Sequence, residues 1–132
     1  MNPDQNFQQA IHAEIVWKTP EVQKFAVALI RHALHLSAST SHHFTTDIVP
    51  DAERGTGTGI AGTVIELLKN GNLIEPVGVV QGGVFYPHRI KSTRKERNSA
   101  WLNVYRLKSV PLAQEFLRRN GQMILQAQLA LV

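Results

Sequence analysis

A glycine-rich run that leads directly into an apolar helical pattern constrains the fold of this chain most. The run reads RGTGTGIAG over residues 54–62, and apolar residues then recur with helical spacing as far as Leu68. Glycine adopts positive φ angles at little cost, so a turn between two helices fits the run. Asn70-Gly71 is typical of a helix end. The pattern therefore predicts a helix over residues 57–70.

The spacing of these glycines also matches parts of known phosphate-binding loops. A Walker loop ends in Gly-Lys-Ser/Thr, whereas no lysine follows the glycines before Lys69. Gly57-x-Gly59-x-x-Gly62 has the bare dinucleotide spacing, but that fingerprint needs a preceding strand. Residues 48–54 contain a proline and three charges instead, and no repeated strand–helix pattern follows. A nucleotide-dependent enzyme is therefore a hypothesis that needs a bound ligand to support it.

The most regular helical signal lies earlier in the chain. Thr19-Pro20-Glu21 combines a capping hydroxyl, a first-turn proline and an acid at the positive end of the helix dipole. The residues that follow, as far as Leu36, carry a broad apolar stripe. We therefore expect a helix that begins at this cap and packs by its stripe.

The other elements follow from weaker signals. A short helix capped by Thr45 or Thr46 is expected to end before Pro50. Two strand-like runs separated by a polar, basic segment predict a hairpin over residues 84–107. A last helix is expected from Ser109, with an interruption at Asn120-Gly121.

The positive charge of the chain is concentrated in one segment. Residues 89–108 contain seven basic residues and one acid, whereas the net charge of the whole chain is +4. Such a local excess favours contact with a polyanion, although short basic loops also occur without a partner. The chain has no cysteine, and it has no apolar run near the roughly 18 residues of a membrane helix. We expect a cytoplasmic, nucleoid-associated protein without membrane contact.

Two short stretches carry a family resemblance. Residues 69–74 (KNGNLI) end the glycine-preceded helix, and residues 104–107 (VYRL) end the basic hairpin. Over residues 20–108 the chain resembles the winged helix-turn-helix family, especially its small members from bacteria, phages and mobile elements. The resemblance implies that the chain binds double-stranded DNA, with helix 57–70 in the major groove and hairpin 84–107 as the wing.

The resemblance also implies a fold class and a set of DNA-contacting residues. The expected class is α+β but mostly α: a three-helix core plus a β-hairpin wing over residues 19–108, flanked by helical extensions at 1–18 and 109–132. The expected role is a non-catalytic transcriptional regulator or a replication or mobile-element accessory factor. The candidate contacts are Thr56, Thr58, Gly59, Gly62, Thr63 and Lys69 on the helix, and Arg89, Lys91, Arg94, Lys95 and Arg97 on the wing.

An alternative function is a winged-helix module for protein–protein interaction in a phage or replication assembly. The exposed face of helix 57–70 favours it, because that face carries one base, Lys69, and one acid, Glu66. Helices that read bases often carry Arg, Asn or Gln instead. The basic hairpin argues against this alternative.

Other residues carry chemistry but form no recognisable set. His32 and His35 share a helical face near His42-His43, yet no carboxylate or cysteine completes a metal site, so neither a metal nor a cofactor is expected. Trp101 and Tyr105 could stack on bases, but packing of the hairpin on the core is the favoured interpretation.

The terminal segments have two possible roles. Residues 1–18 and 109–132 carry more apolar surface than a small domain needs. We expect either a homodimer that pairs through these segments or packing of each segment on its own domain. A two-fold dimer would present two reading helices to half-sites about 34 Å apart.

Overall fold

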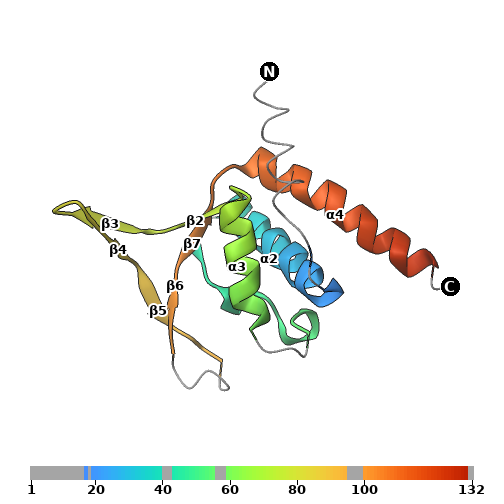
Figure 1. Ribbon diagram of the computed structural model, residues 1–132, viewed down its shortest axis with the longest axis horizontal. Helices are drawn as coiled ribbons and strands as arrows, with labels where there is room; N and C mark the ends of the chain where they lie inside the picture. The colour runs from blue at the N-terminus through green and yellow to red at the C-terminus, as the bar shows by residue number, and fades with distance from the viewer. Residues whose placement is uncertain (1–16, 18, 40–42, 56–58, 95–99, 131–132) are drawn as a thin grey trace.

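The computed structural model describes Trp17 and residues 19–39, 43–55, 59–94 and 100–130, with side chains left out at 37–39 and 121–130. The expected extension 1–18 therefore lies outside the described residues except for Trp17. Three helices and three small antiparallel sheets make up this part of the chain (Figure 1). The helices are α2 (Pro20–Ser39), α3 (Ile60–Asn70) and α4 (Val110–Ala130), and the 3-10 turns are η1 (Thr46–Ile48) and η2 (Asp51–Glu53). The strands are β1 (His43–Phe44), β2 (Ile74–Pro76), β3 (Gly78–Gln81), β4 (Val84–Pro87), β5 (Arg89–Lys91), β6 (Trp101–Asn103) and β7 (Tyr105–Leu107).

The predicted class, a mostly-α winged helix-turn-helix, is wrong. The chain has a mixed α+β fold, with seven short strands in three separate sheets across the described residues. The short core helix expected near Thr45 is only a 3-10 turn, capped where the Thr45 hydroxyl accepts a hydrogen bond from the Asp47 amide at 3.2 Å. Pro50 follows it, and a proline cannot continue a helix because it lacks an N–H donor.

Helix α2 forms the centre of the core. Its residues from Phe25 to Ile30 are all buried, as is typical of a helix covered by other elements. Helices α3 and α4 pack against it and contribute Val64, Leu68 and Phe116, all fully buried. Removing each large apolar side chain of this kind from water stabilises the fold by about 1.5–3 kcal/mol.

Both helix ends that the sequence marks clearly lie where expected. The Thr19 hydroxyl accepts the Val22 amide at 3.2 Å, which caps the first turn of α2. Helix α3 ends at Asn70 in a Schellman motif: the Leu73 amide donates to the Leu68 carbonyl and the Asn72 amide to the Lys69 carbonyl. Asn72 has φ of 61°, so asparagine and not Gly71 takes the left-handed position.

The predicted single hairpin over 84–107 forms only in part. Strands β5 and β6 pair with each other, but β4 pairs with β3, a strand that the sequence pattern did not reveal. Gly82 and Gly83 join β3 to β4 in a two-residue turn with positive φ at both positions. Two ribbons therefore replace one wing: a basic ribbon (β5 and β6) and an apolar arm (β3 and β4).

A closed ring of backbone hydrogen bonds joins these ribbons to the body. The Val77 amide donates to the Val104 carbonyl, Val104 to His88, and His88 back to Val77, at 2.8–3.0 Å. Val77 lies between β2 and β3, His88 between β4 and β5, and Val104 between β6 and β7. The ring therefore fixes where the arm and the basic ribbon leave the sheet of β1, β7 and β2.

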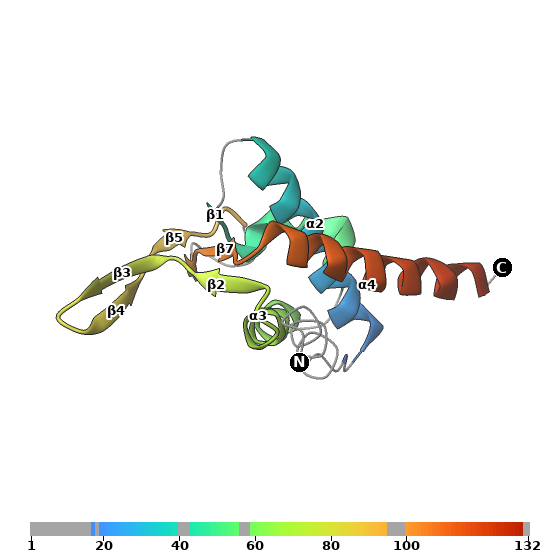
Figure 2. The same cartoon turned by 90° about the horizontal axis from the view of Figure 1, so that it is seen from above.

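Helix α4 runs through the expected interruption at Asn120-Gly121 without a break. Asn120 is buried, and its side-chain amide donates to the Phe116 carbonyl at 3.0 Å. Figure 2 shows the far end of α4 and the apolar arm at opposite ends of the molecule. Within the described residues, none of the helices combines the length and apolar character that crossing a bilayer demands.

Candidate nucleic-acid interface

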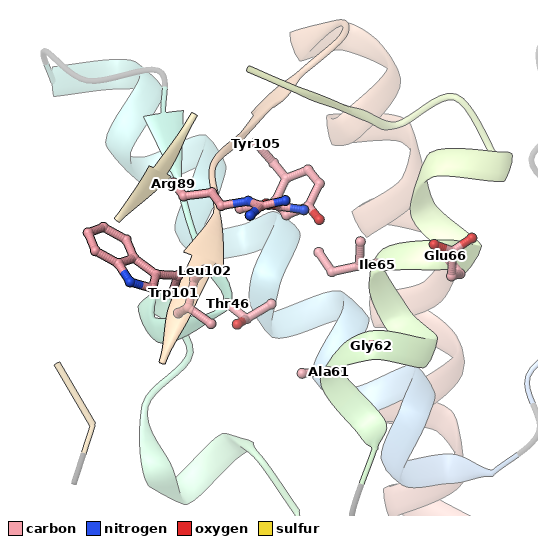
Figure 3. Close-up of a pocket in the computed structure, with 10 residues that line it drawn as sticks. Thr46, Ala61, Gly62, Ile65, Glu66, Arg89, Trp101, Leu102 and Tyr105 are labelled. Carbon is pink, nitrogen blue, oxygen red and sulfur yellow. The ribbon is translucent and has the colours of Figure 1, made fainter. Parts of the chain in front are cut away.

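A groove of about 420 Å³ separates helix α3 from the basic ribbon (Figure 3). Its volume lies within the range of small-ligand sites. One wall comes from α3, the other from β6 and Arg89 of β5. The lining residues are Thr46, Ala61, Gly62, Ile65, Glu66, Arg89, Trp101, Leu102, Asn103 and Tyr105.

The α3 wall is built mainly from small and apolar residues. A Cβ placed on Gly62 would meet nothing within 4 Å, so the helix surface is open at this point. Ala61 precedes it, and Ile65 follows one turn later. Glu66 is the acid of this wall; its side chain is 68% exposed and lies 3.7 Å from the ammonium of Lys69. A backbone can therefore approach the first turns of α3 closely.

The ribbon wall carries cations and polar groups on one face. Arg89 stands opposite Asn103 and Lys91 opposite Trp101, so strand alternation places all four on the same side. The Arg89 Nε donates to Asn103 Oδ1 at 3.1 Å. The Lys91 ammonium lies 5.4 Å from the centroid of the Trp101 ring, within the range of a cation–π contact.

An aspartate anchors the end of the basic ribbon to the body. Asp47 Oδ2 accepts hydrogen bonds from the Ser92 hydroxyl at 2.8 Å and from the Thr93 amide at 2.9 Å. Its other oxygen lies 3.8 Å from the guanidinium of Arg54. Arg54 also donates to the Val49 carbonyl at 2.8 Å. These bonds tie the exit of β5 to η1, so the ribbon wall has a fixed position relative to the core.

The candidate residues on the helix fall in different environments. Gly62 lines the groove, and Gly59 precedes α3 with φ of 75° while its carbonyl accepts the Thr63 amide at 3.1 Å. Thr63 is half-buried, and Lys69 lies in the last turn beside Glu66. Thr56 and Thr58 lie outside the described residues.

The candidate residues of the wing also differ in exposure and in pairing. Arg89 and Lys91 are exposed and, within the described residues, have no carboxylate partner. Arg94 instead pairs with Asp51, and only 17% of its side chain is exposed. Lys95 and Arg97 lie outside the described residues.

Carboxylates neutralise most other arginines in the described part of the chain. Arg106 pairs with Glu75 at 2.6 Å, and Arg31 pairs with Glu53. Arg118 and Arg119 both donate to Glu115, and these hydrogen bonds lower the pKa of Glu115 to about 2. Arg89 therefore differs from these arginines, because it has no carboxylate partner among the described residues. Lys91 has none either, and it shares this property with the exposed Lys24 and Lys108.

Some residues of the groove were missed or misjudged from sequence. Tyr105 is buried and packs on the core as expected, but Trp101 does not, since it is 61% exposed. Asn103, Thr46 and Leu102 were not identified as candidates. Strand alternation alone puts Asn103 on the Trp101 face, whereas its position opposite Arg89 depends on the register to β5.

No metal site is evident in the described part of the chain. No three His, Asp or Glu side chains there come together as ligands. His32 lies 3.2 Å from Glu53 Oε1, and Arg31 contacts the same carboxylate. The His32 ring thus takes part in a cluster of polar contacts between α2 and η2.

Comparison of the chain with protein-family models, with curated proteins and with solved structures finds no match. The function must therefore be inferred from the groove, the two ribbons and their charges.

Proposed function

We propose that this protein is a non-catalytic, double-stranded DNA-binding protein that uses the basic ribbon and the first turns of α3. The observation that carries the proposal is the pair Arg89 and Lys91. Both are exposed on the ribbon face that borders the groove, and neither has a carboxylate partner among the described residues. Arg and Lys side chains that no carboxylate engages can donate their N–H groups to phosphate oxygens.

The chemistry of the interface is suited to a phosphate backbone. Arg89 uses only its Nε on Asn103, which leaves its terminal N–H groups to donate to phosphate oxygens. Each phosphate neutralised releases condensed counterions, so affinity would fall steeply with salt. The open surface at Gly62 allows a DNA strand to lie against α3.

Two cellular roles are consistent with the proposed DNA-binding surface. A transcriptional regulator and a replication or mobile-element accessory factor both need such a surface, and both act in the cytoplasm on nucleoid DNA. A homodimer through the terminal helices would present two copies of it. The extension of α4 away from the body favours this arrangement (Figure 2).

A second candidate function is protein–protein interaction, and the apolar arm favours it. No charged residue occurs from Val77 to Pro87, and Val79, Val80, Val84, Phe85 and Tyr86 are all exposed. An uncharged surface of this kind is not attracted to a polyanion. Exposed apolar surface that is contiguous more often marks a contact with protein.

Fluorescence anisotropy with a labelled blunt duplex, measured over a salt series, tests the DNA-binding proposal. Replacing Arg89 and Lys91 by alanine should weaken binding and make the slope of log K against log [salt] shallower by roughly two units, one for each phosphate that the variant no longer neutralises. The matched control replaces Lys24 and Arg118, two cations of α2 and α4 that do not line the groove. Equal weakening in both double variants, or no duplex binding at low salt, would contradict the proposal.

A further inference from the structure

We infer that the groove between α3 and the basic ribbon holds one unpaired nucleobase, which stacks on Trp101. This inference rests on the proposed DNA binding and specifies its substrate: duplex DNA that carries an unpaired nucleotide. The starting observation is Trp101 itself, a large aromatic residue that is 61% exposed at the rim of the groove. Trp17, the other tryptophan of the chain, contacts Phe116 and donates to Asn120.

The position of Trp101 is set by the ribbon and not by core packing. Residues 101–103 pair with 89–91, and Leu102 stands opposite Ile90. The Lys91 ammonium lies over the Trp101 ring and can cover one of its two faces. The other face is available for a stacking partner. Any base presents a π face, so stacking of this type is independent of sequence.

The groove beside Trp101 supplies hydrogen-bonding groups of both kinds. Asn103 Oδ1 accepts from Arg89, so the Asn103 Nδ2 and the terminal guanidinium N–H groups are left as donors. Glu66 of α3 also lines the groove and is an acceptor, and Figure 3 shows its carboxylate on the side of α3 that faces away from the ribbon. Ile65 and Leu102 provide apolar surface between them. A nucleobase has a flat apolar face and edges that both donate and accept, and this lining matches it.

The cations explain why the ligand belongs to a nucleic acid and is not a free neutral heterocycle. Arg89 and Lys91 stand on the same ribbon face as Trp101, where the phosphates that flank a stacked base would lie. A base inside a duplex is already stacked between its neighbours and cannot reach Trp101. The base in the groove must therefore be unpaired, as in a bulge, a frayed end or locally melted DNA.

Three DNAs of matched sequence test this inference by anisotropy: a blunt duplex, the duplex with one bulged nucleotide, and the duplex with an abasic residue at the bulge. Base–aromatic stacking is worth about 1–3 kcal/mol per base, so the bulged duplex should bind roughly 5- to 150-fold more tightly than the other two. Trp101→Ala should abolish this preference, so that the blunt, bulged and abasic duplexes bind the variant with equal affinity. Trp101→Phe should restore part of the preference, because phenylalanine also stacks.

A spectroscopic measurement reports on Trp101 directly. In a Trp17→Phe variant, Trp101 is the sole tryptophan, and its emission should be quenched by the bulged duplex but not by the abasic one. If blunt and bulged duplexes bind equally, or if emission does not respond, the inference is overturned while the DNA-binding proposal stands. If neither duplex binds at low salt, both fail.

Discussion

Asn120 links helix α4 to helix α2 and to Trp17, and its replacement by alanine should destabilise the fold measurably. Its side-chain oxygen accepts hydrogen bonds from Trp17 Nε1 at 3.2 Å and from Gln23 Nε2 at 3.3 Å. Its amide nitrogen donates to the Phe116 carbonyl at 3.0 Å. The residue is 7% exposed, so the variant leaves two donors without an acceptor at the edge of the core.

The expected magnitude follows from the environment of the two donors. A buried donor without a partner costs about 1–3 kcal/mol. Trp17 and Gln23 are half-buried and gain some compensation from water, so we expect a total loss of about 1–3 kcal/mol for Asn120→Ala. For a chain of this size such a loss lowers Tm by roughly 3–12 °C.

Denaturant titration followed by far-UV circular dichroism measures this change. Gln114→Ala is the control, because Gln114 is an exposed residue of the same helix. Asn→Ala gains more helix propensity than Gln→Ala, so propensity alone would make the Asn120 variant the more stable of the two. A double-mutant cycle with Trp17→Phe should show a coupling of about 0.5–1.5 kcal/mol, the net value of one hydrogen bond. Equal stability of the Asn120 and Gln114 variants, or additivity in the cycle, would refute the reasoning.

Two further predictions concern the apolar arm and the acid response. Gly78→Val should disrupt pairing of β3 with β4, because a Cβ there would lie 2.4 Å from the Tyr86 carbonyl oxygen and 2.6 Å from the Phe85 ring. Amide hydrogen exchange should then accelerate in 79–86 but not in α2, and slow exchange in the arm of the Gly78 variant would contradict this. The control is Gly62→Ala, because a Cβ on Gly62 lies in open space. This control should leave the arm unchanged and stabilise α3 by about 0.5–1 kcal/mol. The hydrogen bonds from Arg118 and Arg119 lower the pKa of Glu115 to about 2, below its ordinary 4.5, so their stabilisation is fully present above about pH 4.5 and is lost as the pH falls toward 2. Unfolding measured across that window should show a smaller acid-induced loss for Glu115→Gln than for the unmodified chain, and identical pH profiles would exclude this role for Glu115.

Only some residues of the candidate site could be predicted from the sequence. The basic character of residues 89–108 identified Arg89 and Lys91, and the helix pattern identified Gly62 as exposed. Asn103 was missed because its role depends on standing opposite Arg89, which is a property of strand register. Arg94 was grouped with the wing, but its partner Asp51 lies far away in sequence.

The sequence by itself determined features whose causes lie within one or two turns of chain. Thr19 caps the first turn of α2, and the pattern to Leu68 followed by Asn70-Gly71 ends α3. Caps, turn residues and helical periodicity act between residues a few positions apart, so they can be read locally.

Only the tertiary structure decided which strands pair and which polar groups meet. Strand β7 pairs with β1 and β2, which lie far from it in the sequence, and the ring of Val77, His88 and Val104 directs the two ribbons apart. Helix α4 continues through Asn120, whose side-chain oxygen accepts hydrogen bonds from Trp17 and Gln23, about 100 positions away in the sequence. These outcomes depend on the free energy of contacts between distant segments, and packing of α2, α3 and α4 brings those segments together.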